Sequence, residues 1–491
     1  MFVFMEIPEP HNFMLRKLEL ILGASYGMLC GLLIYQTSRI FVERFKEEEI
    51  HERQIFLHSA IITFVFYLFI SVWFNHANPP TGDEPSYLLV AHSIANDRDI
   101  DLRNNYDNGD HKKFYKGDFY SHEIEVKGRL LSYHPVLFPC LSVPFYAAAR
   151  RYGVSIFQNI LAGIFAGCLA LFIYKVFRSK KTAFAGAAIA VFTLPFIVFA
   201  NHACTEFLNA VLVIAPFLII LYYRKQYVYA AILSAMLPWA HPRNFLFWIV
   251  IAAIFAWENR KEIKKILSFA VVQAASLAAL FFYNMYFYGV LIPKQGKGEL
   301  TTMEMFGFNL PAILGNFFDQ EFGLLFYTPV FGLAAAGAWI MLKRDKKTVL
   351  YLSSFFLPYF ILIASWANEI WFGGNGVSSR FLTPVVCVFS VFICELIFFS
   401  PRGFAGKILK ISVFWSFLMT LSLFVIPWFR WNKGFGENWL LKFMSEGTGV
   451  NFSGFFPSLT RASTNDYILA VIGAAVFIVI NIYMIKKCRT G

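Results

Sequence analysis

The chain has 491 residues, of which 58% are hydrophobic and only 15% are charged, and its mean hydropathy is +0.56. A soluble globular protein carries roughly 25% charged residues, so this composition excludes an ordinary water-soluble domain. The net charge is +12, but the basic residues gather between apolar runs, and nucleic acid is therefore not an expected partner. The seven cysteines are odd in number and scattered, so they predict neither a disulfide framework nor a metal set.

Apolar runs of about 20 residues, the length that crosses a bilayer, recur along the whole chain. They predict an all-α polytopic membrane protein. The expected spans lie near 56–74, 154–175, 183–201, 206–223, 266–283, 323–342, 349–366, 380–399, 408–428 and 467–485. Residues 17–36 include Lys17 and Glu19, and they either form one more span or lie flat at the interface.

Basic residues gather in every second connection between these runs. The basic connections are 39–53, 175–181, 224–225, 260–265, 343–347, 401–410 and 486–489, and they hold more than half of the 43 Lys and Arg residues. The positive-inside rule places them in the cytoplasm. The other connections then face outward, near 76–153, 284–322, 367–379 and 429–466, and large outer loops of mixed charge suit the handling of a substrate.

One apolar segment, residues 228–257, is broken in its middle by Pro238, His241, Pro242 and Arg243. Basic connections flank both of its ends, and each half is too short to cross a bilayer. We expect a helical hairpin whose tip stops within or near the outer leaflet. Irregular backbone at that depth is tolerated only where it is buried in protein or lines a water-filled cavity.

Asp83 and Glu84 follow a Pro-Pro-Thr-Gly turn at the start of the first outer loop. One interpretation is a helix N-cap, because acids suit the first turn of a helix. The other is a pair of catalytic carboxylates, one facing a reacting group and the other orienting it or holding a metal ion.

Other candidate site residues lie at the outer ends of the expected spans. Arg243, Arg380 and Lys294 are candidates for binding phosphate, with Arg243 first because a cation at membrane depth is costly and usually functional. Snorkelling to the interface is the alternative for Arg380, and a solvated lysine is the alternative for Lys294. His92, His134 and His241 are candidate metal or acceptor ligands, or hydrogen-bonded packing residues.

The stretch GDEPSYLLVAHSIANDRDIDL (82–102) resembles the first outer loop of the GT-C membrane glycosyltransferases. The likeness is to the bacterial branch related to protein mannosyltransferases and to the enzymes that add aminoarabinose to lipid A. In that family an Asp-Glu pair after the first core span opens an amphipathic helix of the type DE-x-x-Y, which Asp83, Glu84 and Tyr87 match. Residues 128–153 resemble a second family stretch, with His134-Pro135-Val136 where a Pro-Pro pair is common. Shorter likenesses at 281–293, 322–330 and 371–384 extend the resemblance over about 56–385.

The resemblance implies a GT-C fold with about eleven to thirteen membrane helices, in which residues 76–153 form interfacial helices on the outer face. Its domains would be an N-terminal segment (1–55), a catalytic membrane core (56–399) and C-terminal membrane helices (400–491) with an outer loop at 429–466. The implied site would lie on the outer face of a bacterial inner membrane.

The implied activity is inverting transfer of a sugar from a polyprenyl-phosphate donor to a hydroxyl of a glycan, lipid or protein. A carboxylate suits the base that this reaction needs, and cations suit the leaving phosphate. Asp83 would be the base, and Glu84 would orient it or ligate a divalent metal ion. The phosphate would bind Arg243, Arg380 and Lys294. Tyr87, His92, His134 and His241 would line the acceptor cavity.

Two other functions compete with glycosyl transfer. A transporter or flippase of lipid-linked saccharides would show paired halves with matching broken helices, and no internal repeat is visible in the sequence. The second is a non-catalytic GT-C-like subunit of a cell-surface polysaccharide system, against which the Asp-Glu pair weighs.

Overall fold

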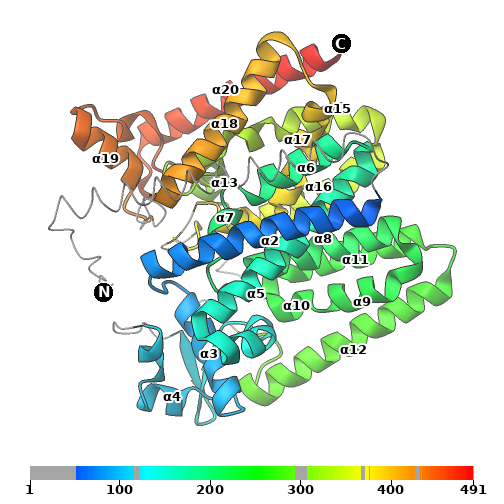
Figure 1. The fold of residues 1–491 in the computed structure, drawn as a ribbon, viewed down its shortest axis with the longest axis vertical. Helices are drawn as coiled ribbons and strands as arrows, with labels where there is room; N and C mark the ends of the chain where they lie inside the picture. Colours follow the sequence, from blue (N-terminus) through cyan, green and yellow to red (C-terminus); the bar gives the residue numbers. More distant parts are fainter. Residues whose placement is uncertain are drawn as a thin grey trace.

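The computed structural model describes residues 51–115, 122–293, 307–365, 371–374, 376, 378–425, 432 and 434–489. Across these residues the protein is helical apart from one short antiparallel hairpin (Figure 1). The expected span or interfacial helix at 17–36 and the candidate Lys294 lie outside the described residues.

Seven helices in the described chain are long and apolar enough to cross a membrane. They lie within α2 (Glu52–Ala77), α5 (Leu137–Phe177), α12 (Ile263–Tyr288), α16 (Lys346–Ala364), α17 (Val386–Phe399) with the preceding turn η5 (Arg380–Val385), α18 (Gly403–Val425) and α20 (Thr464–Arg489). The protein is therefore a polytopic helical membrane protein, as the composition predicts.

The described helices include fewer long spans than the eleven to thirteen or so expected from the resemblance and from apolar length. The run 183–201 is divided into α6 (Lys180–Val191) and α7 (Phe196–Phe199), with a cis Leu194–Pro195 bond between them. The run 323–342 is divided into α14 (Leu324–Tyr327), η4 (Pro329–Leu333) and α15 (Ala334–Arg344). Proline lacks an amide hydrogen and disfavours helical backbone in the residue before it, which explains both breaks.

Helix α5 lies at the centre of the bundle, where α2, α6, α8 (Glu206–Tyr222) and α3 (Glu84–Asn96) all pack against it. Two glycines permit the close approach of α2. A Cβ atom at Gly163 would lie 2.8 Å from the Ala60 carbonyl oxygen, and one at Gly167 would lie 2.8 Å from the Phe56 ring. Small residues at such contacts let membrane helices pack tightly.

The broken segment 228–257 forms a hairpin of two short helical arms. The first arm holds α9 (Tyr227–Ala235), which follows η2 (Arg224–Gln226), and α10 (Leu237–Ala240); the second, after η3 (Pro242–Asn244), is α11 (Phe245–Glu258). The turn begins at His241, whose backbone is extended (φ −167°, ψ 139°), and Arg224 pairs with Glu258 at 2.7 Å where the arms end. Each arm has 14 residues and measures about 21 Å, short of the roughly 30 Å of a hydrocarbon core.

One end of the bundle collects the basic connections around three buried or half-buried glutamates. Glu52 accepts from Lys175 and, at 2.8 Å, from the Tyr223 hydroxyl. Glu258 contacts Lys347 at 2.6 Å, and Arg344 donates both to Glu395 at 2.7 Å and to the Val176 carbonyl at 3.4 Å. The first outer loop begins at the far end of α2 from Glu52, so it lies at the opposite end of the bundle from residues 343–347.

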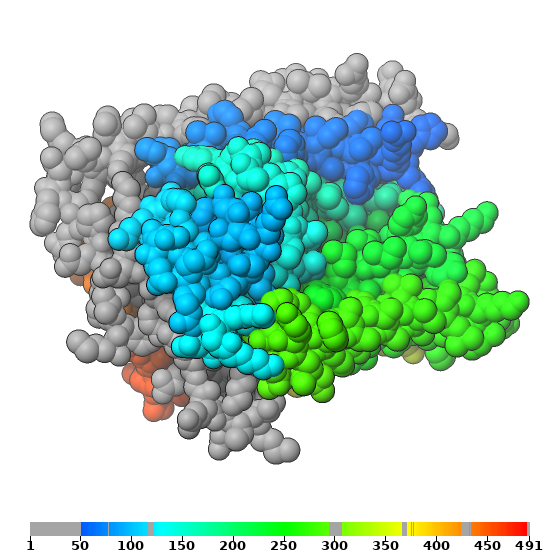
Figure 2. Space-filling view, turned by 90° about the horizontal axis from the view of Figure 1, so that it is seen from below, coloured from blue at the N-terminus to red at the C-terminus, as the bar shows by residue number. Residues whose placement is uncertain are grey.

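The first outer loop consists of α3, α4 (Arg103–Asp107), η1 (Asp110–Lys113) and a hairpin of β1 (Glu123–Val126) and β2 (Arg129–Ser132). It continues into the first part of α5, because the helix breaks at Ala149 and Arg150, whose backbone is not helical. A Cβ atom at Gly153 would lie 1.8 Å from the Phe145 carbonyl oxygen, so only glycine allows the two parts to fold against each other. Figure 2 shows this loop beside α12 on one face of the molecule.

A second layer at the same end is formed by the C-terminal outer region. It contains α19 (Trp439–Thr448), η7 (Ser453–Phe455) and η8 (Leu459–Arg461), and η8 packs against α13 (Leu310–Phe318). Buried Asp319 accepts from the amides of Glu321, Phe322 and Leu459, at 2.8, 2.8 and 2.6 Å. Buried Glu321 accepts from the amides of Gly434 and Gly436 and from the Thr460 hydroxyl. These two carboxylates therefore attach the region to the segment before α14.

Candidate functional site

Asp83 occupies the N-cap position of α3, but its side chain makes no capping hydrogen bond. Helix α3 begins at Glu84, with Pro85 in its first turn, a place that suits proline. The Asp83 carboxylate instead pairs through Oδ2 with Arg380, while Oδ1 lies 3.9 Å from both His122 Nδ1 and His134 Nε2. Burial would raise the pKa of Asp83, but the charge of Arg380 outweighs it and holds the pKa well below its usual range.

Arg380 joins three segments that are far apart in the sequence. Its Nη2 donates to Asp83, its Nε donates to Glu206 Oε1 at 2.6 Å, and its Nη1 donates to the Gly373 carbonyl at 3.4 Å. Because Glu206 begins α8 and Asp83 precedes α3, this one guanidinium holds the start of the first outer loop to the central bundle. Arg380 is thus engaged by two carboxylates and does not snorkel freely to the interface.

Glu84 points to a different set of partners. Its two oxygens receive Nε and Nη2 of Arg151 at 2.8 and 3.1 Å, and Oε2 lies 2.9 Å from His202 Nδ1. Arg151 also donates to the carbonyls of Asn75 and Asn78 at the end of α2. Burial would raise the pKa of Glu84, but the charges of Arg151 and His202 lower it to about 2. The Glu84 carboxylate therefore ties α3 to α2 and α5.

Arg243 and His241 lie together at the tip of the hairpin. Arg243 donates to the His241 ring from Nε at 3.3 Å, and its guanidinium lies 4.3 Å from the centre of the Phe381 ring, next to Arg380. Its Nη1 is buried and has no hydrogen-bond partner within the described part of the chain. Arg243 also interacts electrostatically with Glu206. The hairpin tip is therefore at the same end of the bundle as Asp83. The Nη1 group of Arg243 is available there to donate a hydrogen bond to a ligand.

Tyr87 and His134 pack against each other beside this cluster, with ring centroids 4.9 Å apart. Burial lowers the pKa of His134 to about 4, so that its imidazole is neutral near pH 7. His241 lies within electrostatic range of His134 and Asp83. His92 is placed elsewhere, in the interior of the first loop, where Nδ1 contacts the Tyr146 hydroxyl at 3.0 Å and Nε2 lies 3.6 Å from Asp110.

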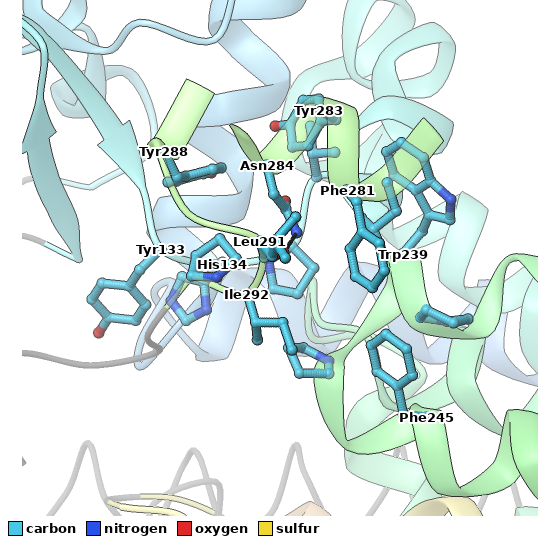
Figure 3. Close-up of a pocket in the computed structure, with 16 residues that line it drawn as sticks. Tyr133, His134, Trp239, Phe245, Phe281, Tyr283, Asn284, Tyr288, Leu291 and Ile292 are labelled. Carbon is cyan, nitrogen blue, oxygen red and sulfur yellow. Dashed lines mark hydrogen bonds between the residues drawn. The ribbon is translucent and has the colours of Figure 1, made fainter. Parts of the chain in front are cut away.

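A groove reaches His134 from the side of the bundle (Figure 3). Its cavity volume, measured as the space open to the centre of a water molecule, is only about 50 Å³. Tyr133 and His134 lie at one wall, Trp239 and Phe245 of the hairpin at the opposite wall, and Tyr283, Asn284 and Tyr288 of α12 complete it. The lining is mostly apolar and aromatic, and it includes the exposed Ile292 just after α12.

Three ligand-type side chains of the described chain could hold a metal ion, namely Asp83, His122 and His134. One ligand atom from each lies within 4.8 Å of the others. Glu84 is not among them, because both of its oxygens contact Arg151. His122 was not singled out from the sequence, although the alternating pattern around Lys127-Gly128 is a hairpin signal that pairs residue 122 with the region of His134. Arg151, His202 and Glu206 were also missed, since their contacts join segments 67 or more residues apart.

These features define the class: a polytopic α-helical integral membrane protein with a charged cluster at the end of the bundle opposite its basic connections. Comparison of the chain with protein-family models, curated proteins and solved structures finds no match.

Proposed function

We propose that the protein is an inverting glycosyltransferase that moves a sugar from a polyprenyl-phosphate donor to an acceptor hydroxyl on the outer face of the membrane. The observation that carries this proposal is the apolar groove that runs from the side of the bundle to His134, whose Nε2 lies 3.9 Å from Asp83 Oδ1. An isoprenoid chain needs such a groove, and its phosphate needs cations at the inner end.

The donor phosphate is assigned to Arg243 and Arg380. Arg243 Nη1 is buried without a hydrogen-bond partner among the described residues, and a buried donor left unpaired is costly until a ligand satisfies it. Guanidinium groups bind phosphate through strong charge-assisted hydrogen bonds, and they stabilise the charge that develops on the leaving phosphate. The outer end of α12 supplies the apolar surface along which the lipid chain enters.

Asp83 is assigned as the base. The acceptor hydroxyl gives its proton to Asp83 as its oxygen bonds to the anomeric carbon, and the bond from that carbon to the phosphate oxygen breaks with the electron pair on phosphate. Arg380 keeps the proton affinity of Asp83 low in the free protein. A bound phosphate would compete for Arg380, and release of Asp83 from this ion pair would raise its pKa toward the range that a general base needs.

Glu84 and Tyr87 are assigned supporting roles. Glu84, bound to Arg151 and His202, holds the first turn of α3 so that Asp83 stays beside His134. Tyr87 packs on His134 at the acceptor side.

The test is sugar transfer from a purified polyprenyl-phosphate donor by the Asp83→Asn variant. Loss of the base should lower turnover ~100-fold or more while the protein still folds. Asp110→Asn, in the same loop and paired with Lys113 at 2.6 Å, is the matched control and should keep its turnover. Near-normal transfer by Asp83→Asn with an intact fold would overturn the assignment of the base.

A further inference from the structure

We propose that Asp83, His122 and His134 form a binding site for a divalent transition-type cation, with Zn²⁺ as the best match. This site belongs to the cluster described above, and its role in catalysis rests on the proposed function. Binding of Zn²⁺ can nevertheless be measured without any sugar substrate.

The β hairpin brings the two histidines together. Strands β1 and β2 pair antiparallel from Glu123 opposite Ser132 to Val126 opposite Arg129, around the two-residue turn Lys127-Gly128. Both turn residues have positive φ values, 50° and 77°, as the tight turn of a two-residue hairpin requires. The pairing continues past the strands, where the Tyr133 amide donates to the His122 carbonyl at 3.1 Å. His122 and His134 lie just beyond the paired strands, with His122 Nδ1 and His134 Nε2 3.0 Å apart.

The three ligand atoms have nearly the spacing of a tetrahedral site. The two nitrogens are 3.0 Å apart, and each is 3.9 Å from Asp83 Oδ1. Ligand atoms about 2.0–2.1 Å from a tetrahedral ion lie roughly 3.3 Å from one another. Movements of about half an ångström would therefore close the site, and side-chain rotation alone can supply them.

The chemistry of the donor set selects the ion. Two imidazole nitrogens and one carboxylate oxygen suit Zn²⁺ or a neighbouring transition metal, whereas Mg²⁺ and Ca²⁺ prefer six or more oxygens. Three protein ligands leave a fourth position open, as in catalytic zinc sites. Because His134 lines the groove, that position faces the place where an acceptor or phosphate oxygen would enter.

Arg380 supports the site from outside the ligand set. It holds Asp83 Oδ2 and leaves Oδ1 directed at the histidines, which is how an outer partner orients a ligating carboxylate. The sequence suggested Glu84 as a metal ligand, but both of its oxygens contact Arg151. The carboxylate ligand of the proposed site is therefore Asp83.

The experiment measures ion binding by the full-length protein, purified in detergent and stripped with a chelator. Zn²⁺ is titrated by calorimetry, and bound zinc per chain is counted by elemental analysis after desalting. The proposal expects one Zn²⁺ per chain and a ligand-field spectrum of tetrahedral type when Co²⁺ replaces it. His122→Ala should weaken binding at least ~100-fold, since loss of an outer-shell partner alone costs 10–100-fold.

Two controls keep the result interpretable. His111→Ala, in the same loop, and Glu125→Gln, on exposed strand β1 and paired with Arg103, should keep the wild-type affinity for Zn²⁺. Thermal unfolding with and without Zn²⁺ shows whether each variant is folded, and only chains with the intact site should be stabilised by the ion. Failure of the wild-type protein to retain zinc, or equal affinity in His122→Ala, would overturn the site.

Transfer assays separate this inference from the proposed function. If the wild-type protein binds no zinc and still transfers sugar, the metal site is rejected and the proposed glycosyltransferase function is supported. One bound zinc that depends on His122, in a protein that transfers no sugar, would establish the site and reject the function.

Discussion

Asp83 and Glu84 are neighbours in the chain, yet their carboxylates contact separate groups because one precedes the first turn of α3 and the other begins it. The Asp83 carboxylate forms an ion pair with the guanidinium of Arg380. Glu84 turns inward to Arg151 and is only 1% exposed. One backbone step therefore separates a residue of the Arg380 cluster from a residue that fixes the loop to the bundle.

The Glu84→Gln variant should be strongly destabilised. Glutamine keeps the shape, but it leaves the Arg151 charge buried without a counter-charge, which costs about 3 kcal/mol or more. The apparent unfolding temperature of the purified protein in detergent measures the loss.

The double variant Glu84→Gln with Arg151→Gln provides the control. The stability losses caused by substitutions at two contacting residues are not additive. The double variant should therefore lose less stability than the sum of the losses in the two single variants. Full additivity would mean that the pair is not coupled in the folded protein.

Several residues singled out from the sequence lie close together in the structure, but their contact partners could not be predicted from the sequence. Asp83, Arg243 and His241 stand out because charge and proline interrupt apolar runs. Their placement depends on Glu206 and His122, which are ordinary residues in the sequence and gain a role only through long-range packing. His92 was grouped with the site by residue type alone, and the structure places it among loop contacts instead.

The segment before α14, which contains Asp319 and Glu321, binds the C-terminal outer region through hydrogen bonds. Asp319 can accept three amide hydrogens because both of its oxygens are acceptors, and Oδ2 alone holds Leu459 at the start of η8.

Asp319→Asn should loosen this attachment. One oxygen becomes an amide that cannot accept, and a buried N–H without a partner costs about 1–3 kcal/mol. Limited proteolysis should cut residues 450–461 faster in this variant. Glu446→Gln, on the exposed face of α19, should be cut at the wild-type rate, and equal rates in both variants would contradict the role of Asp319.

Helix α15 packs against α17 through a glycine that leaves no room for a side chain. A Cβ atom at Gly337 would lie 1.9 Å from the Phe392 carbonyl oxygen. Gly337→Ala should force the helices apart and cost about 1–3 kcal/mol or more, seen as a lower apparent unfolding temperature.

Gly447 in α19 is the matched control for this substitution. It has nothing within 4 Å of an added Cβ, so Gly447→Ala should cause no loss of stability. If both alanine variants unfold at the same temperature, the close approach of α15 and α17 is not what limits stability.

Apolar length alone predicted the uninterrupted helices well and the divided ones poorly. The hairpin at 228–257 was recognisable because His241, Pro242 and Arg243 interrupt the run with basic connections on both sides. The runs 183–201 and 323–342 are as apolar as true spans, and a single proline in each does not reveal from sequence whether the helix bends or ends. Whether each helix bends or ends is decided by packing against the surrounding helices, which bury the short helices.

For the whole molecule, the two ends of the bundle differ in the way their charges are used. At one end Glu52, Glu258 and Glu395 are each paired with basic residues of the connections. At the other end the carboxylates of Asp83 and Glu206 share one arginine, Arg380. An excess of Lys and Arg marks the cytoplasmic side, so the first outer loop should face outward.

This orientation can be tested with single cysteines. In a background where Cys30, Cys140 and Cys488 are replaced by serine, the four remaining cysteines are buried. Lys112→Cys in η1 and Lys261→Cys between α11 and α12 add exposed thiols at opposite ends of the bundle. A membrane-impermeant thiol reagent applied to intact spheroplasts should label Lys112→Cys, and it should label Lys261→Cys only after the membrane is permeabilised. The reverse pattern would place the Asp83 cluster in the cytoplasm, where a donor held in the outer leaflet could not present its phosphate to Arg243.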